Sequence, residues 1–304
     1  MTKILDGYDV AQKIKSEIAP QIEAMGQPPK LAVVVCSEDP ASQIYVQNKL
    51  AACAEVGIQS LLIKPFENPD PKNYVSLSRH GMKILLAQIE SLNNDDSIDG
   101  IIIQLPLPEI IDQQKIFDQI DPLKDVDCFS PVNMGLLLQG RPRLVSCTPA
   151  GIQELLLRNN INFDGKKVTI INRSNIVGKP LQALLSQNNS RANATCVLCH
   201  DHTSPEMLKK ECLSSDIIVV AVGIPNFLTP DMVPQGAVVV DVGINRLAGS
   251  NKIIGDVHPD VYPLTSAYTP VPRGIGPMTV AMLLRNTFMI RSHKNFFNKE
   301  SQYV

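Results

Sequence analysis

The chain has 304 residues, of which 44% are hydrophobic and 19% are charged, so it is long enough for two ordinary domains with a real core. Its net charge of −2 gives no electrostatic reason to expect nucleic acid or an anionic membrane as a partner. No apolar run approaches the ~20 residues of a membrane span, and the charged N-terminal stretch lacks the apolar core of a signal peptide, so we expect no membrane association and a cytoplasmic protein.

The first half of the chain alternates between buried-strand and helical patterns. The expected helices cover 8–25, 39–55, 74–92 and 110–120, and the expected strands cover 31–35, 60–64 and 99–104. Asp39 is the predicted N-cap of the second helix, and Gly57 its C-terminal glycine. Ile44, Leu50 and Ala54 are its predicted apolar face. The alternation predicts a parallel sheet covered by helices.

A second series follows with the spacing of a dinucleotide-binding domain. The expected strands cover 167–171, 195–199, 216–222 and 237–242, and the expected helices cover 150–157, 181–186, 205–211 and 280–289. The fold class is therefore α/β with two domains, of which the second is Rossmann-type. We expect the last helix to rejoin the first domain. This gives domain limits of 1–147 with 277–304, and 148–276.

Tyr45 and Lys49 lie four residues apart and so project from one face of the second helix. A strand-to-helix junction is where ligands gather in α/β proteins. The aromatic ring and the ammonium there suit a flat, polar substrate and a proton transfer. From this stretch alone, a half-buried tyrosine beside a surface lysine is the more common explanation of such a pair.

The turn between Asn172 and Pro180 joins an expected strand to an expected helix, where a Rossmann domain binds pyrophosphate. It lacks the usual glycine fingerprint, so the pattern alone also fits a plain surface loop. Arg173 would lie near the adenosine ribose, where it could clamp a 2′-phosphate.

Three further segments would form a site if one cleft brought them together. Gln104 ends a strand before a proline-punctuated turn, two carboxylates lie close together in 124–127, and 269–279 is a Gly/Pro-dense loop that leads into a helix. Each segment alone is explained by ordinary turn chemistry.

The seven cysteines are scattered and odd in number, which indicates reduced core thiols rather than a disulfide framework. Cys196 and Cys199, followed by His200, match a redox or haem-attachment pattern. They lie in an expected strand without a second ligand pair, so we interpret the match as chance and expect no metal site.

Eight motifs occur together in one order: DPASQIYVQNK, GIIIQLPLP, KDVD, CTPAGI, RSNIVGKP, VDVGIN, GDV and TPVPRGIGPMT. In this order and spacing the chain resembles the bifunctional methylenetetrahydrofolate dehydrogenase/methenyltetrahydrofolate cyclohydrolase family. Their co-occurrence is far more specific than any one of them.

The resemblance implies an N-terminal catalytic domain, a Rossmann domain and a cleft between them for folate and dinucleotide. Tyr45 matches the tyrosine that stacks on folate, Lys49 the catalytic lysine, Gln104 the glutamine that hydrogen-bonds it, and Asp127 the aspartate that anchors the pterin. The other implied substrate-binding residues are Leu105, Pro106, Pro272 and Gly276. The implied cofactor-binding residues are Asn172, Arg173, Ser174, Val177, Gly178, Asp201, Gly223, Ile244 and Thr279.

The resemblance also implies two reactions of one-carbon metabolism and a homodimer. Methylenetetrahydrofolate loses a hydride to the dinucleotide, a step that mainly requires positioning. Water then attacks the cationic methenyl product, which gives 10-formyltetrahydrofolate. A desolvated lysine can act there as a base near neutral pH.

Four residues depart from the family pattern. Asn172 and Cys128 stand where the family usually has glycine, although asparagine tolerates a positive φ. Arg273 replaces a glycine and would place a long cation near the cleft. Asp201 replaces a serine that touches the 2′-phosphate in many NADP-using members.

Asp201 would repel a phosphate but could bond a ribose hydroxyl, whereas Arg173 favours the phosphate. NADP, which the resemblance implies as the family's usual cofactor, is the expected cofactor, and NAD with weak cyclohydrolase activity is the alternative. A folate-binding homologue without turnover is a third reading, which the four matched residues disfavour.

Overall fold

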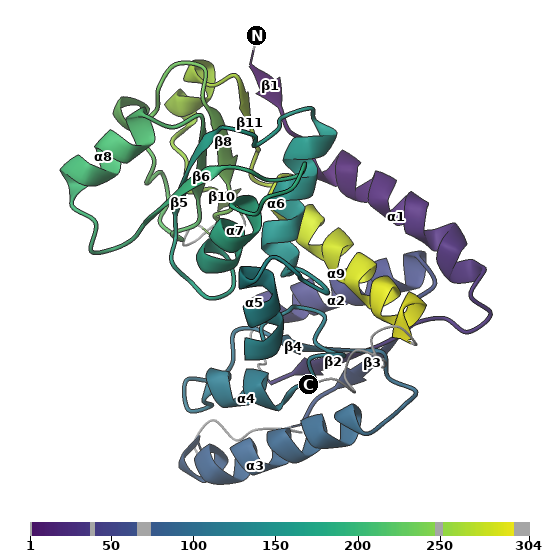
Figure 1. Cartoon of the computed structure of the whole chain (residues 1–304). Helices are drawn as coiled ribbons and strands as arrows, with labels where there is room; N and C mark the ends of the chain where they lie inside the picture. Colours follow the sequence, from purple (N-terminus) through teal and green to yellow (C-terminus); the bar gives the residue numbers. More distant parts are fainter. Residues whose placement is uncertain (1, 37–39, 66–73, 247–251, 295–304) are drawn as a thin grey trace. The chain divides into compact units, whose positions relative to one another are not determined.

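The computed structural model describes residues 2–36, 40–65, 74–246 and 252–294 (Figure 1). The chain forms two compact units, each built around its own parallel sheet. The three-stranded unit comprises Ile14–Met134 and Leu283–Val304, and the six-stranded unit comprises Met1–Lys13 and Gly135–Met282. The predicted two-domain α/β class is confirmed. Relative to the predicted limits, residues 1–13, 135–147 and 277–282 fall in the unit of the larger sheet.

The sheet of the three-stranded unit has the order β3-β2-β4, with β2 in the centre. Its strands are β2 (Lys30–Val35), β3 (Gln59–Ile63) and β4 (Gly100–Gln104), and its helices include α2 (Pro40–Glu55), α3 (Tyr74–Asn93) and α4 (Gln113–Gln119). The side chains of β4 are buried along its whole length, as expected for a parallel strand covered on both faces. All three strands were predicted to within about one residue of their ends.

Helix α2 presents a different face from the predicted one. Val46, Cys53 and Val56 are buried, whereas Ile44 is 52% exposed and Ala54 is also exposed. The buried residues recur at intervals of seven and three, which places them on one side of a helix. The predicted cap Asp39 lies outside the described residues. Gly57 has a φ of +84°, which confirms its predicted role at the C-terminus.

The end of the chain contributes to this unit through the last turns of α9 (Ile275–Ser292). Asn286 Nδ2 donates to the Val126 carbonyl at 2.8 Å in a buried position. Arg291 Nη1 lies 3.3 Å from the buried carboxylate of Asp99. These contacts tie α9 to Asp99, directly before β4, and to Val126, which follows β4, both more than a hundred residues away in sequence.

The six-stranded sheet has the order β1-β11-β8-β7-β5-β6, and all of its neighbouring strands are parallel. Its strands are β1 (Lys3–Ile4), β5 (Lys167–Ile171), β6 (Thr195–Cys199), β7 (Ile217–Val220), β8 (Val238–Asp241) and β11 (Ala267–Tyr268). The chain runs from β5 outward to β6 and then returns to β7 on the other side of β5. This reversal of strand order is the point at which Rossmann sheets bind dinucleotides, beyond the carboxyl ends of the strands.

The other elements of this unit lie around the sheet or connect its strands. They are α6 (Cys147–Arg158), α7 (Gly178–Leu185), α8 (Pro205–Leu213), the hairpin of β9 (Asn245–Arg246) and β10 (Ile253–Ile254), and the 3₁₀ helices η1 (Pro230–Met232) and η2 (Pro259–Leu264). Helix α7 packs against β5 and β6 (Figure 1). Helices α1 (Gly7–Glu23), α5 (Pro131–Leu138) and α9 each contain residues of both units. None of the described helices is long and apolar enough to cross a membrane.

Candidate active site

Lys49 and Gln104 meet in the three-stranded unit. Lys49 Nζ, on α2, donates to Gln104 Oε1, at the end of β4, at 2.9 Å. The Gln104 side chain is only 8% exposed, and its Nε2 donates to the Leu105 carbonyl at 2.6 Å. This second bond fixes the amide so that its oxygen faces the lysine. The contact of Lys49 with a buried amide distinguishes it from an ordinary surface lysine.

Tyr45 lies one turn before Lys49 on the same helix, and its side chain is 36% exposed. A partly exposed aromatic ring offers a flat apolar face to a ligand while its hydroxyl can still reach water. Cys53, one turn after Lys49, is fully buried, and burial raises the pKa of its thiol to about 11 while the nearby Lys49 charge lowers it. This face of the helix is therefore accessible at Tyr45 and Lys49 and buried at Cys53.

The two carboxylates of the 124–127 segment have different environments. Asp125 is buried, and its Oδ2 accepts from the Ser130 N–H at 2.8 Å and from Asn133 Nδ2 at 3.1 Å. Lys124 is also buried and donates to three backbone carbonyls at and just after the end of α3, which ties this segment to that helix. Asp127 is half-buried. Asp125 thus shapes the loop, and Asp127 is the carboxylate of this segment with partial access to solvent.

Cys128 explains why glycine is usual at its position. Its φ is +58°, in the left-handed region that favours glycine, and its side chain is buried. Its Sγ lies 3.7 Å from the Asp125 carbonyl oxygen. The substitution therefore keeps the turn after Asp127, with a non-glycine residue in a conformation that costs roughly 1 kcal/mol.

The Gly/Pro-dense loop lies in the six-stranded unit and brings three predicted residues together. A Cβ on Gly276 would lie 4.0 Å from Ile244 Cδ1, and Thr279 Oγ1 donates to the Gly276 carbonyl at 2.7 Å. The Val271–Pro272 peptide of this loop is cis, as is Leu105–Pro106 in the other unit.

Arg273 also has a positive φ, of +83°, and its guanidinium is held within its own unit. Nη2 lies 2.7 Å from Asp6 Oδ2, and the guanidinium carbon lies 4.7 Å from the centre of the Tyr8 ring. These contacts raise the pKa of Arg273, chiefly through its bond with Asp6. The cation expected near a cleft is thus already paired and stacked, a contact that the sequence did not suggest.

Asn172 organises the loop between β5 and α7 with its side chain. Its Oδ1 accepts from the N–H of Ser174 at 2.8 Å, from Ser174 Oγ at 2.7 Å and from the N–H of Gly178 at 2.9 Å. Its Nδ2 donates to the Ala221 carbonyl at 2.6 Å, which ties the loop to the end of β7.

The predicted reason for tolerating asparagine at position 172 is therefore wrong. Asn172 is not among the residues with a positive φ. Its side chain instead stabilises the loop through four hydrogen bonds. Val177 caps α7, and its N–H donates to Ser174 Oγ at 3.1 Å. A Cβ on Gly178 would overlap the Asn172 carbonyl, so only glycine allows this tight turn at the start of a helix whose dipole favours an anion.

Arg173 and Asp201 form an ion pair. From the sequence, Arg173 was expected to favour a 2′-phosphate and Asp201 to disfavour it. Arg173 Nη2 lies 2.5 Å from Asp201 Oδ1, and both side chains are substantially exposed. His202 Nε2 lies 3.5 Å from the same carboxylate. Desolvation raises the pKa of Asp201, but the charge and hydrogen bond of Arg173, a backbone hydrogen bond and the nearby His202 together outweigh it and hold the pKa below its ordinary value. Asp201 is thus paired with the guanidinium that is expected to bind a 2′-phosphate.

The residues of the dinucleotide side follow the carboxyl ends of four neighbouring strands. The Asn172 loop follows β5, Asp201 follows β6, Gly223 follows β7 and Ile244 follows β8. Gly223 has a φ of +69°, and Ile244 is 44% exposed. Parallel strands place all four positions at one edge of the sheet, which fits a bound dinucleotide.

Two buried carboxylates behind these loops were missed. Asp241 and Asp256 belong to the VDVGIN and GDV motifs, and both are at most 1% exposed. In each motif the aspartate lies within two residues of a glycine, which is typical of closely packed segments. The sequence pattern did not assign either aspartate a role. Burial raises the pKa of Asp241 to about 6 despite three backbone N–H donors.

This raised pKa predicts a pH dependence of stability. Because the folded pKa of Asp241 exceeds its unfolded value, the folded state holds the proton more tightly, and its contribution to stability falls as pH rises from about 4 to 6. The contribution of Asp241 to the free energy of unfolding falls by about 3 kcal/mol at most. Urea unfolding of the wild type and Asp241→Asn at pH 4.5 and 7 measures it. A stability difference between the two proteins that is constant with pH contradicts it.

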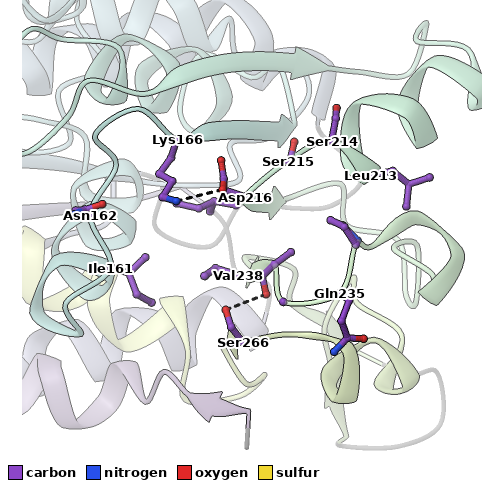
Figure 2. A pocket seen from close by; sticks show the side chains of 14 residues that line it. Ile161, Asn162, Lys166, Leu213, Ser214, Ser215, Asp216, Gln235, Val238 and Ser266 are labelled. Atoms are coloured by element: carbon purple, nitrogen blue, oxygen red, sulfur yellow. Dashed lines mark hydrogen bonds and ion pairs between the residues drawn. The ribbon is translucent and has the colours of Figure 1, made fainter.

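The hollow in Figure 2 lies at the opposite edge of the six-stranded sheet and has a volume of about 400 Å³. Its lining includes Lys166, Asp216 and Ala237, which directly precede β5, β7 and β8. Lys166 Nζ and Asp216 Oδ1 pair with each other at 3.3 Å. This edge holds the amino ends of the strands, so the hollow is separate from the dinucleotide loops.

The cysteines are all free, and six of the seven are buried. Cys196 and Cys199 lie on β6 as predicted, and burial raises the pKa of Cys196 to about 11. A thiol with so high a pKa is a poor nucleophile near neutral pH. In the described ranges no three His, Cys, Asp or Glu residues are grouped so that they could hold a metal ion.

Comparison with known proteins finds matches along most of the chain. Residues 5–127 match the catalytic domain of tetrahydrofolate dehydrogenase/cyclohydrolase, and residues 146–295 match its NAD(P)-binding domain. A bifunctional protein FolD of Rhodopirellula baltica is 46% identical over 302 residues, which cover 94% of this chain and 95% of the relative.

Two solved structures are similar over almost the whole chain. The bifunctional FolD methylenetetrahydrofolate dehydrogenase/cyclohydrolase from Campylobacter jejuni is 41% identical with a TM-score of 0.85, covering 97% of this chain and 99% of that one. The Trypanosoma brucei enzyme, complexed with NADP cofactor and an inhibitor, is 31% identical with a TM-score of 0.85, covering 96% and 98%.

Proposed function

Because the chain belongs to the tetrahydrofolate dehydrogenase/cyclohydrolase family, we propose that Lys49, Tyr45, Gln104 and Asp127 form its folate site and that the loops following β5 to β8 form its dinucleotide site. The protein is a bifunctional enzyme of one-carbon metabolism. It oxidises 5,10-methylenetetrahydrofolate to the methenyl form and hydrolyses that product to 10-formyltetrahydrofolate.

The observation that carries the assignment of the folate site is the bond between Lys49 and the buried Gln104. In the hydrolysis step a water molecule attacks the methenyl carbon and must lose a proton. Lys49 is the proton-transferring group, and Gln104 holds its Nζ in place through a fixed amide oxygen. The exposed ring of Tyr45 stacks on the folate, and Asp127 accepts from the pterin N–H groups. Leu105, Pro106, Pro272 and Gly276 complete the proposed folate-binding set.

In the oxidation step the protein mainly has to position the two reactants. The bound dinucleotide supplies the hydride acceptor. Asn172, Ser174, Val177 and Gly178 shape the turn at the start of α7, whose N-terminus favours a pyrophosphate. Gly223, Ile244 and Thr279 are the proposed contacts nearer the reacting end.

We assign NADP as the cofactor, with Arg173 as the group that binds its 2′-phosphate. The guanidinium offers a planar pair of donors that suits a phosphate, and the Trypanosoma brucei relative was solved with NADP. Asp201 weakens this preference because it must release Arg173 first.

A steady-state assay of methylenetetrahydrofolate oxidation with NADP and NAD in parallel tests this function. Formation of the methenyl and then the formyl product is followed by absorbance. We expect both products, with a higher kcat/KM for NADP. Oxidation with NAD alone and no formyl product would overturn the bifunctional NADP assignment, and binding without turnover would overturn both.

We further propose a homodimer in the cytoplasm, with functional domains at 1–147 with 277–304 and at 148–276. The six-stranded sheet supports dimerisation because β6 is an end strand whose residues Cys196, Val197 and Leu198 are only half-buried. Light scattering on the assay sample measures the molar mass. A monomer at micromolar concentration contradicts the dimer.

A further inference from the structure

Asp256 joins the two dinucleotide loops nearest the centre of the six-stranded sheet. Its Oδ2 accepts from the backbone N–H groups of Val222 at 2.7 Å and Gly223 at 3.0 Å, in the loop after β7. Its Oδ1 accepts from Asn245 Nδ2 at 2.8 Å, directly after Ile244 in the loop after β8. One fully buried carboxylate therefore holds both loops.

Asp241 in turn holds Asp256 in place. Its Oδ1 accepts from the N–H of Asp256 at 3.0 Å and from the N–H of Gly243 at 2.9 Å. Its Oδ2 accepts from the N–H of Val257 at 3.0 Å. The Thr269 hydroxyl accepts from the Asp241 N–H at 2.8 Å, which links this residue to the start of the Gly/Pro-dense loop.

Two glycines make this arrangement possible. A Cβ on Gly255 would overlap the Asp241 carboxylate, and a Cβ on Gly243 would overlap the Asp256 carboxylate. The two segments therefore approach so closely that any other residue would displace a carboxylate. Two carboxylates buried this close are tolerated only when their oxygens are hydrogen-bonded, and each of these two accepts from three N–H donors, so both segments are held in fixed positions.

We propose that Asp256, supported by Asp241, is a positioning residue for the dehydrogenase reaction. It sets the spacing between Gly223 and Ile244, and so the depth at which the reacting end of the dinucleotide lies. The inference rests on the proposed function, since Gly223 and Ile244 belong to the proposed cofactor-binding residues. Hydrolysis of supplied methenyltetrahydrofolate consumes no dinucleotide, and its proposed proton-transferring pair, Lys49 and Gln104, lies in the three-stranded unit.

Asp256→Asn tests the proposal. Its amide can accept from Val222 and Gly223 or from Asn245, but its NH2 group then faces the donor it used to accept from. We expect the KM for NADP to rise and the kcat of oxidation to fall, together lowering kcat/KM about 100-fold, because a shift of about 1 Å has that effect. We expect hydrolysis of supplied methenyltetrahydrofolate to stay within about twofold, since the residues that Asp256 holds lie in the six-stranded unit, whereas Lys49 and Gln104 lie in the three-stranded unit.

A reciprocal exchange provides the rescue. In the double variant Asp256→Asn with Asn245→Asp, donor and acceptor swap sides, so both loops are held again and the number of acidic residues is unchanged. We expect oxidation to recover at least about tenfold over the single variant. Asn245→Ala, which removes one bond and keeps the carboxylate, is the milder variant to use if Asp256→Asn does not fold.

Glu154→Gln is the matched control. Glu154 is a buried carboxylate of the same unit that pairs with Arg158 and Arg191, away from the dinucleotide loops. In Glu154→Gln we expect oxidation and hydrolysis to fall by the same factor or not at all. The proposal is overturned if Asp256→Asn and Asn245→Ala lower oxidation and hydrolysis equally, or if the exchange gives no recovery. A wild type without oxidation would instead refute the proposed function.

Discussion

Replacing Lys49 with alanine is expected to abolish hydrolysis of methenyltetrahydrofolate while folate still binds. The variant removes the group that accepts the proton of the attacking water and leaves Gln104 without its partner. A positioned acid–base residue contributes a factor of about 10²–10⁴ to the rate of such a step. Tyr45 and Asp127 remain, so the contacts that hold the folate are kept.

The measurement is the decay of supplied methenyltetrahydrofolate above its spontaneous rate, with folate binding followed by fluorescence. Lys83→Ala is the control, because Lys83 is an exposed lysine of the same unit on α3. Gln104→Leu should lower hydrolysis less than Lys49→Ala, since the lysine then keeps its charge but loses its fixed position. Normal hydrolysis in Lys49→Ala would remove this residue from the mechanism.

Replacing Asp201 with serine is expected to raise affinity for NADP relative to NAD by about tenfold or more, because the change removes a negative charge next to the 2′-phosphate. It also frees Arg173, whose guanidinium is now held by Asp201 at 2.5 Å. The gain should be largest at low ionic strength, since both side chains are exposed and their charges are screened by salt.

The ratio of kcat/KM values for NADP and NAD measures this effect. Arg173→Ala should reverse the preference, and the gain from serine should be smaller in the double variant than in Asp201→Ser alone, because the serine acts partly by releasing the arginine. Asp231→Ser is the control, as Asp231 is an exposed aspartate paired with Lys209 elsewhere in the same unit. An unchanged preference in Asp201→Ser would show that residue 201 does not face the ribose.

The fold was predictable where an element has a long and regular pattern. The predicted limits of β5 and β6 are those observed, because each is a short apolar run bounded by polar turns. Strands β1 and β11 were missed because each has two residues and forms only through pairing with a distant segment. Helix α5 was missed because its run of apolar residues has no helical period.

The candidate site was predictable as a set of motifs, but the contacts within it were less so. The pairing of Lys49 with Gln104 was expected from the resemblance and is present. The pairing of Arg173 with Asp201 was not, because a sequence shows two opposite preferences and no distance. Asp256 was invisible for the same reason: its partners lie 11 to 34 residues away and are mostly backbone groups.

The pairing of β1 with β11 sets the order in which the protein can fold during its synthesis. Residues Lys3 and Ile4 acquire their strand partners only when Ala267 and Tyr268 have been made. At roughly 5–20 residues per second, the start of the chain waits for about 10–50 s, while the strands of the three-stranded sheet are all available after about two fifths of that time. A large sheet with so distant a closing strand folds late, and until β11 is made the unpaired edge at β8 is the place where a ribosome-bound chain is most exposed to wrong pairing.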